Sequence, residues 1–249
     1  MQSREWDKTA AKYYEEVLSP IKNSYKNPIY KDLERIYTKN NVADIGCGLG
    51  ELLPLLSQKF KHVTALDYSK EMIHRAKQTH HELKNVEFYQ QDMDDLAKFK
   101  EQFDVVISVN SIITPEIKKL NTIFQEIHNS LKQNGTFICI VPAMEAFLYQ
   151  SMLMGNEYIT RENNIKKIRQ KILRQISQKN HDFLLGIYDY NQKQKAYYRF
   201  ELIWRLKKAG FKQIIIKEVE YPWEEIKEAG QTYFPKEEPV WDWYAICKK

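Results

Sequence analysis

A short apolar run that ends in an acid and three alternating glycines is the part of this chain best suited to bind a ligand. It reads NVADIGCGLG from position 41 to position 50, and its key members are Asp44, Gly46, Cys47, Gly48 and Gly50. Glycine leaves the backbone open to a ligand and adopts turn conformations that other residues avoid. The leucines that follow recur at helical spacing, so the loop opens onto a helix N-terminus with unpaired amides. The spacing therefore predicts a cofactor loop, in which Cys47 is a packing residue rather than a nucleophile.

A second acid stands where it can serve the same ligand. Asp67 ends another apolar run, His62 to Leu66, about 20 residues beyond the glycines, where a carboxylate can accept hydrogen bonds from both hydroxyls of a ribose. Tyr68 follows and can pack on an adenine ring, and Ser69 has the position of a helix N-cap. This order of strand, loop, helix and strand is typical of sites for adenosine-containing cofactors.

The segment DIGCGLG resembles the first motif of the class I S-adenosylmethionine-dependent methyltransferases, in which an acid stands two places before G-x-G-x-G, and it matches at every defined position. Later segments are similar to further motifs of that family: FDVVIS at 103–108, LKQNGTFI at 131–138 and LKKAGF at 206–211. Asn134 replaces a family glycine, and asparagine tolerates the same left-handed conformation. The resemblance is close over residues 42–141 and looser over 200–219.

A nicotinamide dinucleotide is the rival cofactor. Its fingerprint, G-x-G-x-x-G, requires glycine where this chain has Glu51. That carboxylate would also lie near the helix end that receives a pyrophosphate, where a further negative charge is unfavourable. The resemblance instead implies S-adenosyl-L-methionine as the cofactor, S-adenosyl-L-homocysteine as its product, and no metal ion.

The resemblance also implies roles for four further positions. Asp92 would accept from the adenine amino group with Met93 as its apolar neighbour, and a backbone carbonyl near Asn110 would receive the methionine amino group. Tyr14, in an N-terminal helix, would close over the cofactor; Tyr13 is one alternative, and an aromatic ring packed on the sheet edge is another. Each acid taken alone could equally be a solvated turn residue, so the prediction depends on the ordered set.

The implied fold is α/β: a Rossmann-like, seven-stranded, mostly parallel sheet with helices on both faces and an antiparallel last strand. We expect a single methyltransferase domain over residues 1–249. Its parts are an N-terminal helical cap at 1–40, a cofactor-binding core at 41–142, a helical substrate lid inserted after the fifth strand at 143–198, and the C-terminal part of the sheet at 199–249. In such sheets ligands bind beyond the carboxyl ends of the strands, so an insertion after the fifth strand can roof the site.

The insertion carries an unusual charge pattern. Apolar residues at helical spacing between 165 and 176 predict an amphipathic helix whose other face is rich in lysine and arginine. We expect this helix to cap the core with its charges in solvent; docking on RNA or on a membrane surface is the alternative. Alternating apolar residues predict an extra strand between 182 and 190, with Phe183, Leu185 and Ile187 on one face.

Composition agrees with a soluble intracellular enzyme. A chain of 249 residues with 43% hydrophobic content can bury one large core, and no apolar run reaches membrane-spanning length. The net charge of +5, from 38 basic and 33 acidic residues, is too balanced to indicate nucleic-acid binding by itself. The 3 cysteines have neither metal-ligand nor disulfide spacing. We therefore expect a cytoplasmic monomer or homodimer with a small-molecule substrate and no nucleic-acid partner.

The resemblance implies transfer of a methyl group to an O or N atom of a small molecule, because the additions to the core are a lid and a short helix rather than a domain that reads RNA or protein. Two alternatives remain: an RNA or protein methyltransferase that docks through the basic helix, and a non-catalytic regulatory protein that binds S-adenosylmethionine. No catalytic residue can be named from the sequence, and His181, beside the inserted region, is the histidine to test.

Overall fold

The structure is a computed structural model that describes most of the chain. The described residues are 19–21, 27–36, 40–159, 164–176, 182–189, 193–228 and 233–249. Tyr13, Tyr14 and His181 lie outside them, so the roles given to them stay predictions. The described helices and strands are α3 (Pro28–Arg35), β1 (Asn41–Ile45), α4 (Leu53–Lys59), β2 (His62–Asp67), α5 (Lys70–Thr79), β3 (Val86–Gln90), the 3-10 helix η1 (Ala97–Phe99), β4 (Phe103–Val109), α6 (Ile117–Ser130), β5 (Leu131–Pro142), α7 (Met144–Ile159), α8 (Ile165–Ile176), β6 (Ile187–Asp189), β7 (Lys193–Lys195), α9 (Arg199–Lys208), β8 (Lys212–Tyr221), α10 (Trp223–Glu228) and β9 (Val240–Lys248).

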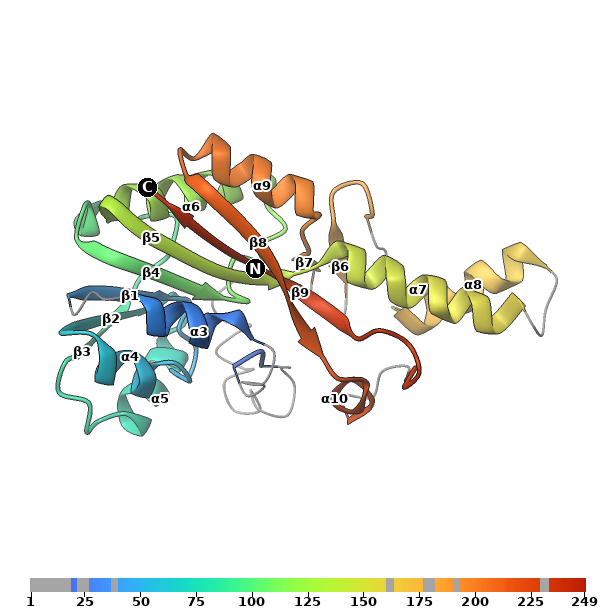
Figure 1. The fold of residues 1–249 in the computed structure, drawn as a ribbon, viewed down its shortest axis with the longest axis horizontal. Helices are drawn as coiled ribbons and strands as arrows, with labels where there is room; N and C mark the ends of the chain where they lie inside the picture. The colour runs from blue at the N-terminus through green and yellow to red at the C-terminus, as the bar shows by residue number, and fades with distance from the viewer. Residues whose placement is uncertain are drawn as a thin grey trace.

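Seven strands form one sheet in the order β3-β2-β1-β4-β5-β9-β8 (Figure 1). Strands β1 to β5 run parallel, β9 is antiparallel to β5, and β8 is antiparallel to β9. The predicted sheet, mostly parallel with an antiparallel last strand, is therefore confirmed. The strand order reverses at β1, which lies between β2 and β4, so the loops after β1 and β4 diverge beside a crevice at this switch point.

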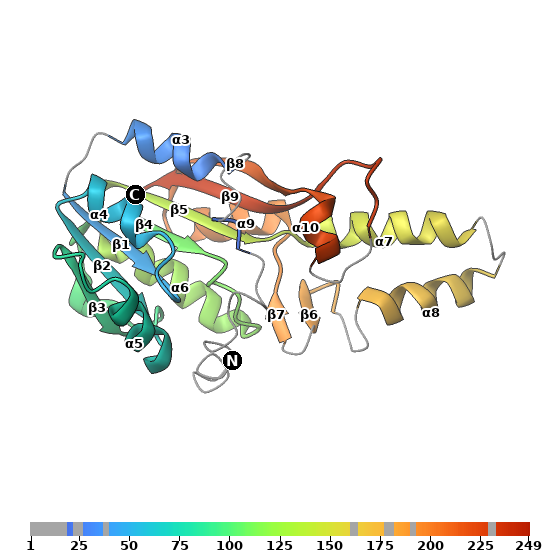
Figure 2. The same cartoon turned by 90° about the horizontal axis from the view of Figure 1, so that it is seen from below.

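The central strands are apolar on both sides because helices cover both faces of the sheet. In β5, Phe137, Cys139 and Val141 belong to the core under α6 and α9, whereas Ile138 and Ile140 belong to the core under α3 and α4. Successive side chains of a strand point to opposite faces, so one apolar run serves two cores. Figure 2 shows the two helix layers on either side of the sheet. The loops at the carboxyl edge therefore begin from strands that are packed on both faces.

The insertion forms an arm made of α7 and α8. The two helices pack on each other closely: a Cβ added to Gly155 would lie 3.2 Å from Cδ1 of Ile172. Figures 1 and 2 show both helices extending away from the sheet. The amphipathic helix predicted at 165–176 is confirmed, but the expectation that it caps the core is wrong, because it packs on α7 instead of on the sheet.

The return from the arm contains a short hairpin rather than the predicted strand over 182–190. Among the described residues 182–189, Ile187–Asp189 forms the strand β6, which pairs antiparallel with β7, and Asp182 forms an isolated bridge with Ile187. Residues 183–186 form a turn in which Gly186 has a φ of +63°. The alternation of apolar residues was misleading here, because Leu185 is 43% exposed instead of lying on a buried strand face.

Candidate cofactor-binding site

The glycine loop is tied to both strands that neighbour β1. The amides of Gly46 and Cys47 donate to the carbonyl of Leu66, in β2, at 2.7 and 2.9 Å. Gly46 has a φ of +73°, and a Cβ added to it would lie 2.2 Å from Cβ of Ser111, which follows β4. The Ser111 hydroxyl in turn donates to the carbonyl of Ile45 at 2.9 Å. Backbone conformation and space together therefore require glycine at position 46.

Asp67, the last residue of β2, holds the loop from the other side. Its Oδ2 accepts from the amide of Gly48 at 3.0 Å, and its Oδ1 accepts from the amide of Ser69 at 2.8 Å. Ser69 caps α5 as predicted, since its Oγ accepts from the amide of Met72 at 3.1 Å. The carboxylate thus lies beside the glycine loop at the carboxyl end of its strand, where an acid can reach a ribose.

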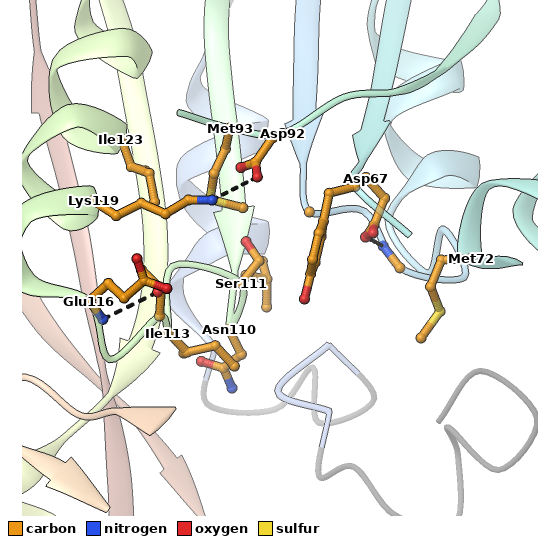
Figure 3. Close-up of a pocket in the computed structure, with 15 residues that line it drawn as sticks. Asp67, Met72, Asp92, Met93, Asn110, Ser111, Ile113, Glu116, Lys119 and Ile123 are labelled. Carbon is orange, nitrogen blue, oxygen red and sulfur yellow. Dashed lines mark hydrogen bonds and ion pairs between the residues drawn. The ribbon is translucent and has the colours of Figure 1, made fainter. Parts of the chain in front are cut away.

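Asp92 follows β3 and is paired with a lysine that the sequence analysis did not single out. Nζ of Lys119, on α6, lies 2.7 Å from Oδ2 of Asp92 and 3.0 Å from Oδ2 of Asp94. Figure 3 shows the Lys119 side chain crossing the pocket wall toward Asp92. Burial alone lowers the pKa of Lys119, but its hydrogen bonds to the two carboxylates and their negative charges raise that pKa overall, so the ammonium stays charged at neutral pH. Asp92 therefore meets a ligand as part of an ion pair.

Asn110, directly after β4, has a left-handed backbone with a φ of +45°. Its amide donates to the carbonyl of Ile140 at 2.8 Å, and its Nδ2 donates to Oδ2 of Asp242 at 2.9 Å. The hydroxyl of Tyr221 donates to the same Asp242 oxygen at 2.6 Å. Within the described part of the chain, the buried Oδ1 of Asn110 has no hydrogen-bond partner. An unpaired buried acceptor costs about 1–3 kcal/mol, so this atom is suited to a ligand that donates to it.

These loops surround a cavity of about 760 Å³, a volume that includes the solvent at its open mouth. Among the residues named from the sequence, those that line it are Gly46, Gly48, Asp67, Tyr68, Asp92, Met93 and Asn110. The lining residues that were not named as site residues are Met72, Val109, Ser111, Ile113, Thr114, Glu116, Lys119 and Ile123. Most of these residues end or follow β4 or lie on α6. Because Asn110 stands at the end of a parallel strand, its neighbours in the sequence could have been predicted to line the same site.

Three predicted site residues, in or directly before the glycine loop, are not part of the described lining. Asp44 is 3% exposed, and burial together with the charge of Asp67 raises its pKa to about 7. Cys47 is buried, and burial first of all raises the pKa of its thiol well above the usual value, which agrees with a packing role. Gly50 has a φ of +83°, and an added Cβ would lie 2.9 Å from the ring of His80. These three residues shape the loop.

The chemistry of the cavity suits a positively charged ligand with an adenosine part. Its described lining holds three carboxylates, of Asp67, Asp92 and Glu116, against one ammonium, of Lys119. S-adenosylmethionine carries a sulfonium and an ammonium against one carboxylate, whereas a pyrophosphate would face this lining with like charge. The bare backbone at Gly46 and the acid at the end of β2 complete the fit, so the residues present can accommodate this cofactor.

Comparison with known proteins agrees with this geometry. Residues 42–135 match a family model described as a methyltransferase domain. The putative methyltransferase YqeM of Bacillus subtilis (strain 168) is 29% identical over 136 residues, which cover 53% of this chain and 53% of that protein. The crystal structure of the PH0226 protein from Pyrococcus horikoshii OT3 has a TM-score of 0.64 at 19% identity, covering 91% of this chain and 90% of that chain. The DhpI-SAM-HEP complex has a TM-score of 0.63 at 17% identity, covering 99% and 95%.

The comparisons therefore support a class I S-adenosylmethionine-dependent methyltransferase domain in this chain, with the family match confined to residues 42–135. The matched residues include the glycine loop, Asp67 and Asp92, whereas the arm lies outside them. The two solved structures, both under 25% identical, show that the likeness extends to the fold over nearly the whole chain. The chain spans about half the length, or less, of the curated relatives that it matches. None of the helices that the structure describes has both the length and the hydropathy needed to cross a bilayer.

Proposed function

We propose that this chain binds S-adenosyl-L-methionine in the cavity described above and transfers a methyl group to an O or N atom of a small molecule. The observation that carries the proposal is the convergence of the glycine loop, Asp67 and Asp92 on one cavity, at the carboxyl ends of β1, β2 and β3. The DhpI-SAM-HEP complex supports it, since that complex contains SAM on a fold that this chain shares.

The proposed cofactor residues have distinct tasks. Asp67 accepts from the ribose hydroxyls, Asp92 accepts from the adenine amino group, and the carbonyl oxygens of Asn110 accept from the methionine amino group. Tyr68 and Met93 pack on the adenine, while the backbone at Gly46 and Gly48 approaches the cofactor closely. Asp44, Cys47 and Gly50 act indirectly by shaping the loop. Tyr14 keeps the closing role implied by the resemblance, and no metal ion is part of the proposal.

The chain contributes mainly by positioning the two reactants. When bound, the cofactor supplies a methyl group on a positively charged sulfur, which an O or N lone pair displaces with release of a proton and formation of S-adenosyl-L-homocysteine. Aligning the lone pair in a site with little water can remove several kcal/mol of the barrier. An amine acceptor needs only to lose its proton before attack, whereas a hydroxyl requires a base nearby.

We propose a single domain with parts at 1–40, 41–142, 143–198 and 199–249. The methyl acceptor would bind on the side of the cavity that is formed by the end of the insertion. The amide of Lys195 donates to the carbonyl of Ile113 at 2.8 Å, and the hydroxyl of Tyr197 donates to the carbonyl of Ile112 at 2.8 Å. Ile113 lines the cavity. These contacts support a lid whose last residues, rather than its two long helices, bound the substrate.

Calorimetric titration with S-adenosylmethionine and S-adenosylhomocysteine tests cofactor binding. We expect saturable binding of both ligands, and Asp67→Ala should weaken it by about a hundredfold, because two backbone amides and the ribose lose a buried charged acceptor. Asp95→Ala, which removes an exposed acid, is the matched control and should bind like the wild type. No heat with either ligand, or full affinity in Asp67→Ala, would contradict the proposal.

Incubation with methyl-labelled cofactor and cell extract tests the acceptor class. Label should appear in the small-molecule fraction after the extract is separated from protein and RNA. Label in the RNA or protein fraction would favour the macromolecular alternative instead. Normal cofactor binding with no label in any fraction would favour a non-catalytic binding protein.

A further inference from the structure

One wall of the cavity presents a hydrogen-bond acceptor and a donor side by side. Asp92 and Lys119 both line the cavity, and Nζ of Lys119 lies 2.7 Å from Asp92 and 3.0 Å from Asp94. The side chains of Asp92, Lys119 and Asp94 are 38%, 29% and 30% exposed, and the first two are the ones that line the cavity. Figure 3 shows Asp92 and Lys119 meeting beside Met93.

Asp92 and Lys119 can each form a further hydrogen bond in addition to the one between them. An ammonium has three N–H donors, and the two carboxylates take two of them. Oδ1 of Asp92 has, among the described residues, one long contact of 3.4 Å, from the amide of Asp94. At that distance the hydrogen bond is weak. A ligand edge at this wall can therefore either donate to Asp92 or accept from Lys119.

Purines differ in this property at position 6. A 6-amino group donates, whereas a 6-oxo group accepts. A wall with carboxylates alone would bind the amino group and reject the oxo group, because two acceptors would face each other with no proton between them. The ammonium of Lys119 supplies the donor that such a wall would lack.

We propose that Lys119 determines the purine selectivity of this site: Asp92 accepts from a 6-amino purine, Lys119 donates to a 6-oxo purine, and the cavity binds nucleosides of both kinds. The inference rests on the proposed function, which places the purine at Asp92. Asp94 has a positioning role in it, because its carboxylate is the second contact that holds the Lys119 ammonium at the wall.

Calorimetric competition between S-adenosyl-L-homocysteine and its 6-oxo counterpart, S-inosyl-L-homocysteine, tests this inference. The wild type should bind the two ligands within about tenfold of each other, and Lys119→Met should prefer the 6-amino ligand by about a hundredfold. Lys119→Arg keeps a charged donor and should return most of the wild-type ratio. Lys118→Met, at the exposed neighbouring position of the same helix, is the matched control and should keep that ratio.

Two results with these variants would overturn the inference. In the first, Lys119→Met leaves the ratio of the 6-amino to the 6-oxo affinity unchanged and has no other effect. In the second, it lowers both affinities equally, which would mean that Lys119 only stabilises the loop that carries Asp92 and Asp94. A wild-type preference already near a hundredfold would also contradict it. Thermal unfolding establishes that each variant is folded, and Lys119→Arg tests the donor independently of Lys119→Met. Absence of binding of both ligands to the wild type would instead overturn the proposed function, and this inference with it.

Discussion

The cofactor loops and the arm are held in place by different interactions. In the loops, hydrogen bonds from main-chain amides fix the conformation. The amides of Gly46 and Gly48 donate to residues at the end of β2, and there is no room for a side chain at position 46. In the arm, two helices pack through apolar side chains, while Met152 and Ile165 remain 54% and 78% exposed. A site built on the backbone tolerates almost no change of residue type, whereas a helix pair accepts many sequences. A single sequence therefore predicts the position of the loops, whereas for the arm it predicts the amphipathic helix but not what that helix packs on.

The two regions meet at a buried charge cluster on the return from the arm. Nζ of Lys195 lies 2.7 Å from Glu201, and the Arg205 guanidinium lies 2.8 Å from the same carboxylate. The Lys195 and Arg205 side chains are 0% and 6% exposed. The backbone amide of Lys195 also donates a hydrogen bond to the carbonyl of Ile113, which lines the cavity. A change in this charge cluster can therefore affect the cavity wall.

A pair of glycine substitutions tests the comparison most severely. Gly46→Ala should abolish measurable cofactor binding and lower the free energy of unfolding by about 3–5 kcal/mol, since it adds a left-handed strain to a severe clash with Ser111. Gly155→Ala, in α7, should change stability by less than about 1 kcal/mol and leave affinity unchanged, because alanine favours a helix and Ile172 can shift slightly. Urea unfolding and calorimetry measure both. Equal losses of stability and affinity in the two variants would contradict the difference between the cofactor loops and the arm.

Breaking the cluster between the two regions should have the next largest effect. Glu201→Gln removes the carboxylate that pairs directly with two buried cations and should cost about 3–5 kcal/mol of stability. Lys195→Met leaves the Glu201–Arg205 pair intact and should cost at most about 2 kcal/mol. Urea unfolding curves of the two variants, recorded in one buffer, give the difference. The reverse order of costs would show that the cluster is not held by charge pairing.

Asp44 allows a test by pH beneath the glycine loop. Burial raises its folded-state pKa from 3.8 to about 7, so the folded state retains a proton that the unfolded chain has already lost. This contribution to stability is therefore greatest below about pH 4 and falls as the pH rises to about 7. Asp44→Asn should unfold at the same temperature as the wild type near pH 4 and at a higher temperature near pH 8. A higher unfolding temperature at pH 4 only would contradict the assignment.

The smallest effect is expected at the basic face of the arm. Replacing the exposed cations of α8 by glutamine should change stability by less than about 0.5 kcal/mol and cofactor affinity by less than about twofold. The residues to replace are Lys166, Lys167, Arg169, Lys171 and Arg174. Filter binding of RNA at several salt concentrations provides the contrary test. A steeply salt-dependent affinity that disappears in the variant would make the arm a docking surface.

The parts of the fold that could be predicted share a local cause. The central strands were found because their apolar runs alternate between two cores, and Asp67 was found because its distance from the glycines is set by one strand and one helix. The same reasoning failed at 183–186, where an alternating pattern occurs in an exposed turn. Periodicity reports which side chains share a face, and it says nothing of whether that face is covered.

By itself the sequence determined the glycine loop, the acids at the strand ends and the strands that carry them, because these depend on spacings of a few residues along one segment. Only the tertiary structure decided that Lys119 pairs with Asp92, 27 residues away, and that Asp242 holds Asn110 across 132 residues. It also decided that the basic helix leaves the sheet to pack on α7. Contacts between distant segments are selected by the burial of charges and apolar surface in the folded chain, and no pattern within a single segment encodes them.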